Sequence, residues 1–208
     1  MAKPARKPVD PARRVIDRTL SLAAERGWRR VSLGDIAAAA KLPLGELYRL
    51  YPSRTAILAA FVRRIDEAVL AEGEAEGATP RERLFDLLMR RFEALRPYKA
   101  GVAAILKDCG GDPLALLCGG ARLKRSMSWM LEAADLSSHG LLGQARAKGL
   151  AVVYLATLRS WLADDTADMS RTMAALDKHL RRAEGVAGLC RRLGRRGPRG
   201  TSEAASAA

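Results

Sequence analysis

The stretch that most constrains this 208-residue chain is residues 31–58, VSLGDIAAAAKLPLGELYRLYPSRTAIL. Ser32 precedes an apolar run and Asp35 follows three residues later, a pattern typical of a capped helix start. Pro43 has a preset φ and no N–H, so it suits the first turn of a second helix. Pro52 ends that helix before a third one begins. Two short helices joined by a three-residue turn predict a helix-turn-helix.

The rest of the chain also favours helix. Ala, Leu and Arg are abundant, prolines number only nine, and β-branched runs are few, a composition that favours helix nearly throughout. Hydrophobic residues make up 49% and charged residues 28% of the chain, which is ordinary for a globular protein with a core. The fold class is therefore predicted to be all-α. Apolar residues at helical spacing predict helices at residues 11–26, 54–72, 80–95, a short one ending at Leu106, and then 113–134, 140–163 and 168–184.

Two features of the later helices carry further expectations. Gly119-Gly120 lies inside the predicted helix 113–134, and we expect a kink or a break there. The last two helices are joined by the short loop Asp164-Asp165-Thr166, which predicts an antiparallel hairpin. A second copy of the chain would complete a four-helix bundle with this hairpin, so a homodimer is predicted. The dimerisation residues predicted on this basis are Leu150, Leu158, Met169, Met173, Leu176 and Leu180.

The net charge of +13 is unevenly distributed along the chain. Residues 1–64 hold 14 Lys or Arg against 5 Asp or Glu, residues 65–184 hold 17 against 17, and residues 185–208 hold 5 against 1. A basic head on a neutral body is typical of a DNA-binding domain joined to a regulatory domain. General use of arginine throughout the chain is the alternative, and the neutral middle argues against it. The domains predicted are a disordered basic arm at 1–10, a helix-turn-helix DNA-binding domain at 11–57, a ligand-binding and dimerisation domain at 58–184 and a basic flexible tail at 185–208.

Residues that could carry catalysis or bind a metal are scattered. Two histidines and three cysteines occur without metal-ligand spacing. Asp164, Asp165 and Asp168 follow an apolar helix, so capping of the next helix is favoured over metal binding. We expect no enzymatic activity, no cofactor and no metal. The chain start lacks the apolar stretch of a secretory signal and no apolar run is long enough to span a bilayer, so a cytoplasmic location is expected.

The helix-turn-helix stretch resembles the N-terminal signature of TetR-type transcriptional regulators, which are all-helical homodimers with a ligand-binding body. The residues that carry the resemblance are Ser32, Ile36-Ala37, Gly45, Tyr48, Tyr51, Ser53 and Arg54. The resemblance covers residues 11–60 and implies double-stranded DNA as the partner. In this family the second short helix reads base edges while its surroundings grip phosphates. The DNA-binding residues it implies are Ser32, Lys41, Leu44, Gly45, Glu46, Tyr48, Arg49, Tyr51 and Arg54.

Several positions depart from the family pattern. Lys41 replaces the usual Gly of the turn, Pro43 replaces a Ser/Thr cap, and Leu50 is apolar where a polar residue is common. Glu46 stands where a Thr or Ser commonly approaches the DNA backbone. A carboxylate there is repulsive to phosphate unless it accepts from a cytosine amino group or pairs with Arg49. Sequence-specific DNA binding and a helix-turn-helix that has lost this role both remain open.

The body is similar to a second TetR-fold protein. Residues 81–184 resemble the C-terminal part of the mitochondrial ubiquinone-biosynthesis accessory protein, a lipid binder that lost DNA binding. This resemblance implies an isoprenoid or other lipid as ligand, and membrane contact through the basic C-terminal tail. The residues that carry it are Arg96-Pro97-Tyr98, Trp129, Arg146, Tyr154, Asp164-Asp165, Asp168, Thr172 and Leu176.

Two functions are therefore weighed. The first is a homodimeric DNA-binding regulator controlled by a small apolar effector, and the alternative is a lipid-binding accessory protein with a vestigial helix-turn-helix. In both, the ligand pocket would be a hollow in the core of the body, lined by core side chains. The ligand-binding residues predicted are Leu88, Phe92, Ile105, Met127, Trp129, Tyr154, Leu158 and Trp161.

Overall fold

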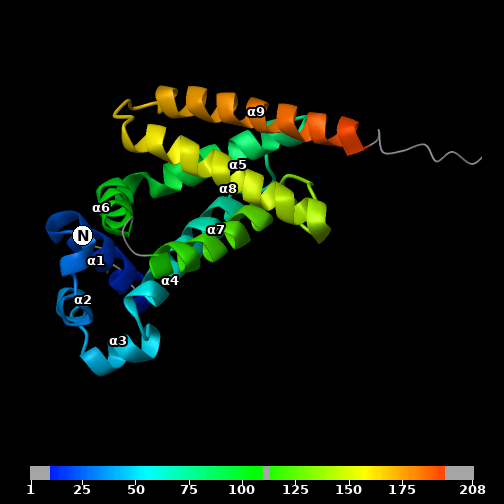
Figure 1. The fold of residues 1–208 in the computed structure, drawn as a ribbon. Coiled ribbons are helices and arrows are strands. Elements are labelled where there is room, and N and C mark those ends of the chain that lie inside the picture. The colour runs from blue at the N-terminus through cyan, green and yellow to red at the C-terminus, as the bar shows by residue number, and fades with distance from the viewer. Residues whose placement is uncertain (1–9, 110–112, 195–208) are drawn as a thin grey trace, which may run out of the picture.

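The computed structural model describes residues 10–109 and 113–194, and every regular element within them is a helix (Figure 1). The predicted all-α class is confirmed. The head contains α1 (Pro11–Arg26), the short 3₁₀ turn η1 (Trp28–Arg30), α2 (Leu33–Ala40) and α3 (Leu44–Leu50). The body contains α5 (Pro80–Leu95), the 3₁₀ turn η2 (Arg96–Tyr98), α6 (Lys99–Cys109), α7 (Pro113–Ala133), α8 (Gly140–Leu162) and α9 (Ser170–Gly194), and α4 (Arg54–Ala71) joins the two.

The head is a small three-helix unit built around α1. Asp10 caps α1 by accepting from the Ala12 amide at 3.1 Å, and Gly27 ends the helix with a φ of 82°. A positive φ is accessible to glycine without steric conflict, so the chain can turn sharply there. Trp28 and Val31 are buried in the corner that this turn creates. Both side chains belong to the hydrophobic core that includes the buried faces of α1 and α2.

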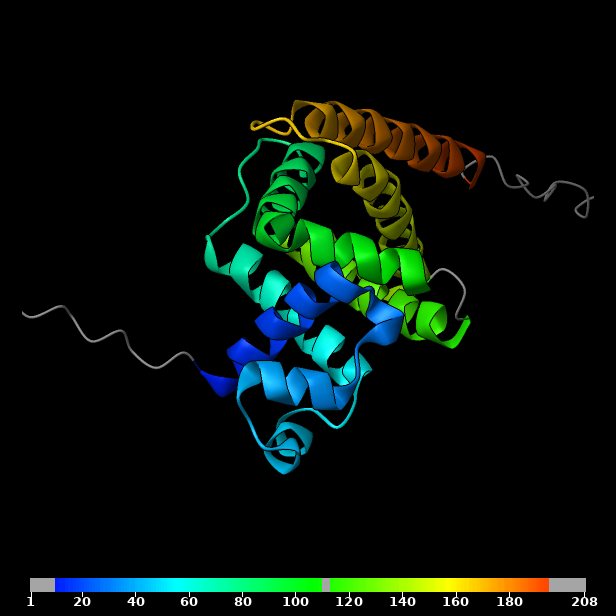
Figure 2. The ribbon, with the colours of Figure 1, turned by 90° about the vertical axis from the view of Figure 1, so that its left-hand side faces the viewer.

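Two contacts tie the head to the body. The first is α4, which packs on α1 at one end and on α5 and α7 along the rest of its length. The second is the crossing of α1 and α6, which lie against each other in Figures 1 and 2. At this crossing a Cβ on Gly101 would lie 2.5 Å from the carbonyl oxygen of Leu20. Only glycine permits so close an approach, so α1 rests directly on the backbone of α6.

The last two helices form the predicted antiparallel hairpin, which runs along one edge of the body (Figure 1). Asp164 holds the loop between them by accepting from the Thr172 amide at 2.8 Å and from the Thr166 amide at 3.1 Å. Asp168 accepts from the Ser170 amide at 3.1 Å. The predicted capping role of these two acids is confirmed. Asp165 instead accepts from Lys99 Nζ at 3.1 Å.

One expected break and two helix ends differ from the sequence-based prediction. Helix α7 continues through Gly119-Gly120 as one element, and Met127 and Met130 in its second half are buried in the core. Helix α6 runs past Leu106 to Cys109, and α9 continues to Gly194 instead of ending at 184. Each glycine in a helix interior costs only about 1 kcal/mol relative to alanine, so long helices tolerate them.

The residues predicted to form the dimer interface are instead buried against other helices of the same chain. They lie on the apolar faces of α8 and α9, but those faces pack inside the monomer, where α9 also contacts α5. An amphipathic pattern identifies the face that is buried and not the element that buries it. Buried in this way are Leu150, Leu158, Met169, Leu176 and Leu180, and Met173 is half-buried.

Some expectations lie outside the described residues. They are the basic arm, at residues 1–9, and the part of the predicted tail at residues 195–208. Much of the predicted membrane contact falls in that part of the tail and so also lies outside the described residues. Among the residues that are described, no helix is both long and apolar enough to cross a membrane.

Candidate nucleic-acid interface

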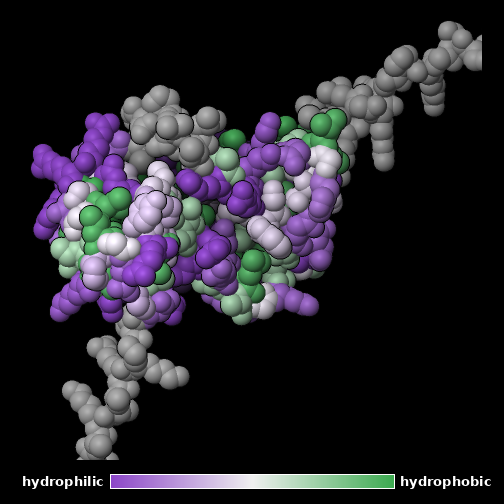
Figure 3. Space-filling view, turned by 90° about the horizontal axis from the view of Figure 1, so that it is seen from below, coloured by the Kyte–Doolittle hydropathy of each residue, from purple (hydrophilic) through white to green (hydrophobic). Residues whose placement is uncertain are grey.

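Helix α3 presents most of its side chains to solvent. Leu47 alone is fully buried and anchors the helix against the head. Leu44 is 56% exposed and Tyr48 is 67% exposed, on the outer side of the helix. In Figure 3, which views the molecule from below, hydrophilic surface surrounds a small hydrophobic patch on the head. Such an outward-facing helix, standing on one buried side chain, can enter a groove without unfolding its support.

The turn before α3 has the backbone conformation that a glycine would adopt. Lys41 has a φ of 54°, and its amide donates to the carbonyls of the last turn of α2. Arg14 Nε donates to the carbonyl of Ala40 at 2.8 Å and so covers the same helix end. The left-handed turn is thus retained although the family's glycine is absent, and the Lys41 side chain is exposed.

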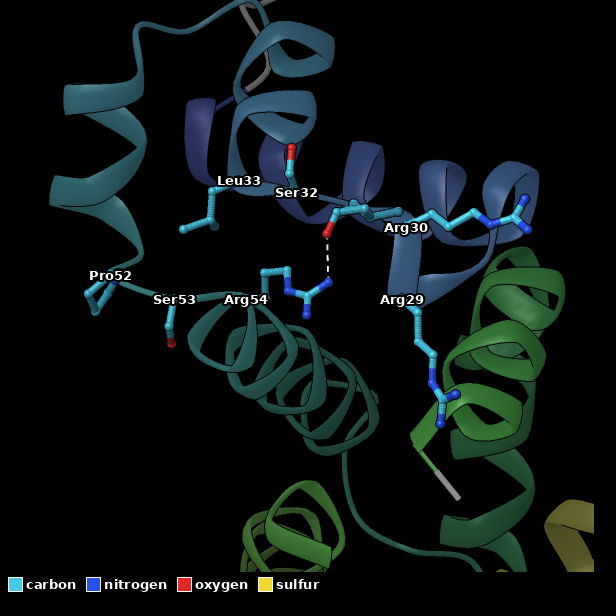
Figure 4. A pocket seen from close by; sticks show the side chains of 8 residues that line it. Arg29, Arg30, Ser32, Leu33, Pro52, Ser53 and Arg54 are labelled. Atoms are coloured by element: carbon cyan, nitrogen blue, oxygen red, sulfur yellow. Dashed lines mark hydrogen bonds between the residues drawn. The ribbon is translucent and has the colours of Figure 1, made fainter. Parts of the chain in front are cut away.

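A surface hollow of ≈ 490 Å³ lies between the start of α2 and the start of α4 (Figure 4). Ser32 Oγ accepts from the Asp35 amide at 3.1 Å, and Asp35 Oδ2 accepts from the Ser32 amide at 2.9 Å. These hydrogen bonds hold the pKa of Asp35 below its usual range. Ser53 Oγ accepts from the Ala56 amide at 3.1 Å and caps α4. Two helix N-termini therefore open onto one hollow, and the first amides of each have no partner within their helix, an arrangement suited to an anion such as phosphate.

Arg54 is placed differently from the prediction that it contacts phosphate. Its Nη1 donates to the carbonyl of Trp28 at 3.0 Å and to that of Val31 at 2.6 Å, and its guanidinium lies 4.8 Å from the centre of the Trp28 ring. Figure 4 shows this side chain turned toward the backbone on the far side of the hollow. Its first role is to hold η1 to α4, while its charge still lies beside the hollow.

Arg29 and Arg30 also line the hollow, although neither was among the DNA-binding residues predicted from the sequence. They lie in a 3₁₀ turn, where helical periodicity gives no signal, although two adjacent arginines before a predicted cap could have indicated them. Arg29 extends toward α6 (Figure 4), where its amide donates to Asp108 Oδ2 at 2.9 Å. Arg30 runs away from the hollow.

Of the other predicted DNA-binding residues, some are exposed to solvent on α3 and one points into the protein. Gly45 and Arg49 are exposed on α3, beside Leu44 and Tyr48, and Glu46 is half-buried. Within the described residues, Glu46 and Arg49 do not form the ion pair that was one alternative for this carboxylate. Tyr51 instead points inward, where its hydroxyl lies 3.5 Å from the carbonyl of Ala12 and burial raises its pKa.

The predicted ligand-binding residues do not share one cavity wall. Phe92 stacks on Tyr154 at 5.4 Å between ring centres and lies 5.8 Å from Trp161. Trp129, by contrast, is 58% exposed and lines a separate groove between α4 and α7. It is two residues from the fully buried Met127 on the same helix, so the two side chains face different directions. The remaining residues of that prediction are Leu88 and Leu158, both buried, and Ile105, which is partly buried against the core.

Comparisons with known proteins agree with this geometry. Residues 15–61 match the family model of bacterial regulatory proteins, tetR family. The HTH-type transcriptional repressor KstR of Rhodococcus jostii (strain RHA1) is 31% identical over 85 residues, which span 40% of this chain and 40% of that protein.

Solved structures extend the similarity to the body. A TetR transcriptional regulator from Nitrosomonas europaea ATCC 19718 superposes with a TM-score of 0.68 and 25% identity over 85% of this chain and 99% of its own. A TetR transcriptional regulator from Rhodococcus sp. RHA1 superposes with a TM-score of 0.61 and 21% identity, covering 83% of this chain and 94% of its own, and this supports the fold alone. The N-terminal domain therefore matches the tetR family of bacterial regulatory proteins, and the fold along most of the chain is that of TetR-type regulators.

Proposed function

We propose that this protein is a homodimeric DNA-binding transcriptional regulator whose α3 enters the major groove of each half-site. The observation that carries the proposal is the exposed α3 beside a hollow onto which two capped helix N-termini open. The relatives reported above are described as regulators, which favours this function over that of a lipid-binding accessory protein.

The surface divides the contacts with DNA into two kinds. The hollow, with Ser32 and Ser53 at its helix starts, would hold backbone phosphates and fix the orientation of the head. The outer face of α3 would read bases, with Arg49 suited to guanine and Leu44 suited to a thymine methyl group. Tyr48, exposed between them, would contact the backbone or a base edge.

Glu46 gives this proposal a specific base preference. Since it is half-buried and forms no ion pair with Arg49 in the described structure, its carboxylate is available to accept from a cytosine amino group. Glu46→Gln should therefore relax the preference for C·G at one position of each half-site and strengthen binding to random duplex. If Glu46 contacts no base and only repels nearby phosphate, Glu46→Gln should strengthen binding to random duplex without changing the preference for C·G.

The dimer would form through the outer face of the α8–α9 hairpin. Four apolar side chains of α8 and α9 remain exposed to solvent: Leu141 (92%), Val152 (67%), Leu155 (45%) and Val186 (63%). These replace the six dimerisation residues predicted from sequence. Val152→Asp with Leu155→Asp should yield a monomer in sedimentation velocity, whereas Leu106→Asp, at an exposed site on α6, should not.

The DNA-binding experiment is a salt titration of affinity by fluorescence anisotropy. The regulator should bind a palindromic fragment from its own genomic neighbourhood more tightly than random duplex, with a steep dependence on salt concentration. Tyr48→Ala with Arg49→Ala should weaken specific binding by roughly tenfold or more, since each good base contact contributes about 1–3 kcal/mol. Lys178→Ala removes one positive charge from α9 and is the matched control.

Two outcomes would contradict the proposal. The first is equal affinity for the palindrome and for random duplex at every salt concentration. The second is an unchanged affinity in the Tyr48→Ala, Arg49→Ala variant.

Control by a small effector belongs to the same proposal, because the described head and body are joined through α4 and the α1–α6 crossing.

A further inference from the structure

The groove between α4 and α7 has the features of a ligand site. Its volume is ≈ 700 Å³, within the range of about 300–1,000 Å³ for small-molecule sites. One wall is α4, where Ala56, Ala59 and Ala60 leave room that larger side chains would fill. The other wall is α7, with Trp129 at one position of a stripe that also contains Arg122 and Arg125. The two helices lie side by side in the structure (Figures 1 and 2).

The charges around the groove leave a positive excess. Arg63 pairs with Glu67 at 3.4 Å, so these two charges largely cancel. Asp66 also lines the groove, but it accepts from Ser126 Oγ at 2.6 Å and from the buried guanidinium of Arg91. Its negative charge is therefore already compensated.

Two arginines remain for a ligand. Within the described residues, Arg122 and Arg125 form no ion pair, and they lie one turn apart on the same face of α7. Two cations beside an apolar wall match a ligand with an apolar chain and one anionic end, because each part of the groove then meets its complement.

We propose that this groove binds a single-chain amphipathic anion, with its carboxylate at Arg122 and Arg125 and its alkyl chain along α4 and Trp129. The groove is distinct from the buried core around Phe92, where the sequence had predicted an apolar ligand. It reaches Tyr51, the C-cap residue of α3, and Ala56 in the first turn of α4. A bound chain would therefore touch both the body and the base of α3.

Trp129 supplies a direct signal for binding. Of the three tryptophans, Trp28 and Trp161 are buried and Trp129 is 58% exposed. A titration of the full-length protein with dodecanoate, kept below its micelle concentration, should shift the tryptophan emission to shorter wavelength in a saturable manner. Trp129→Phe should abolish the shift while calorimetry still detects binding.

Charge and shape variants test the two halves of the ligand separately. Arg122→Gln with Arg125→Gln should weaken dodecanoate binding by about tenfold or more, and dodecanol should bind the unaltered protein correspondingly less well. Ala59→Leu should weaken both ligands, because it fills the groove without changing its charge. Arg171→Gln with Lys178→Gln removes the same charge from α9 and should leave binding unchanged.

Three results would overturn the proposal. They are an absence of saturable binding, equal affinity in the Arg122→Gln, Arg125→Gln variant and the α9 control, and a signal that appears only with phospholipid vesicles. The last would identify a membrane surface, in place of a free amphipath, as the partner.

The consequence for regulation rests on the proposed DNA binding. Dodecanoate should change the affinity for the palindrome by roughly fivefold or more, because effector and DNA would be coupled through α4. The fluorescence titration contains no DNA, so the ligand site stands or fails by itself even if the protein does not bind DNA.

Discussion

The head and the body use arginine in different ways. In the head, Arg14 and Arg54 donate to backbone carbonyls, those of Ala40, Trp28 and Val31. Ion pairs also occur in the head, as between Arg26 and Asp35 at 3.7 Å, but in the body arginines meet carboxylates more often. Examples are Arg81 with Asp177 at 2.9 Å, Arg90 with Asp86 at 2.6 Å, and the buried pair of Arg91 with Asp66.

This difference preserves charge where a polyanion would bind. A carbonyl satisfies a guanidinium donor but carries no net charge, so the arginine can stabilise the fold and still attract phosphate. A carboxylate satisfies the donor and cancels the charge. Composition underlies this difference, because the first 64 residues hold 14 Lys or Arg against 5 Asp or Glu, a net charge of +9, whereas residues 65–184 hold 17 of each.

The largest expected effect on stability concerns the buried Arg91–Asp66 pair in the body. Arg91→Ala should destabilise the protein by about 3–5 kcal/mol, because it leaves Asp66 without its cation. Burial opposes the charge of Arg91, but Tyr154 and Asp66 raise its pKa, so it remains protonated. Urea unfolding followed by circular dichroism measures the loss. Replacing both partners, Arg91→Met with Asp66→Leu, should recover most of it, and no recovery would mean that the charges themselves are required.

Asp164 is the converse case, a buried acid held by neutral donors. Burial by itself would raise its pKa, but hydrogen bonds from Thr166 and Thr172 hold the pKa well below the ordinary 3.8. Asp164→Ala should destabilise by about 2–4 kcal/mol, since four donors in the α8–α9 loop lose their acceptor. This residue is mostly buried in the described structure, and Asp165→Ala, at an exposed neighbour, is the control.

The pH dependence of that effect has a definite sign. A carboxyl whose pKa is lower in the folded state stabilises the fold above its unfolded pKa, and this contribution is lost as the pH falls toward its folded pKa. The stability difference between the native protein and Asp164→Asn should thus be constant near neutral pH and shrink below about pH 4. A difference that grows on acidification would contradict the assignment.

Arg54 tests the head side of the comparison. Arg54→Ala should destabilise by roughly 1.5–3 kcal/mol, through two lost hydrogen bonds to carbonyls and the lost contact with Trp28. Arg54→Lys keeps the charge but cannot reproduce this geometry, so it should recover little of the thermal stability. If the lysine variant were as stable as the native protein, the charge alone would account for the role of Arg54.

The smallest expected effect is at the turn before α3. Lys41 adopts a left-handed φ of 54°, which costs a non-glycine residue about 1–2 kcal/mol. Lys41→Gly should therefore stabilise the protein by up to about 1 kcal/mol, after the greater flexibility of glycine in the unfolded chain is subtracted. Ala38→Gly, three residues earlier within α2, should instead destabilise by about 0.5–1 kcal/mol. The same Lys41→Gly variant should bind DNA less tightly, since it removes an exposed charge from the head.

Local signals in the sequence predicted the helices and their starts well. Ser32 with Asp35 forms the capping box that was predicted, and Thr79 with Glu82 forms a second one, since each needs only residues within one turn. Helix ends were less predictable, because α9 continues through glycines that interrupt the pattern without stopping the helix. The inward turns of Arg54 and Tyr51 could not be predicted at all, since their partners lie 23 or more residues away in the chain.

The sequence by itself determined the all-α class, the helix-turn-helix and the concentration of charge at one end, because periodicity, capping and composition act over short stretches. Only the tertiary structure decided which apolar faces meet inside the monomer. The pattern of α8 and α9 marks a face to be buried, and packing within one chain buried Leu176 and Leu180 while leaving Val152 and Leu155 exposed. Packing also placed Trp129, Arg122 and Arg125 of α7 beside α4. A groove between two helices depends on how the helices pack, so the sequence of either helix alone does not reveal it.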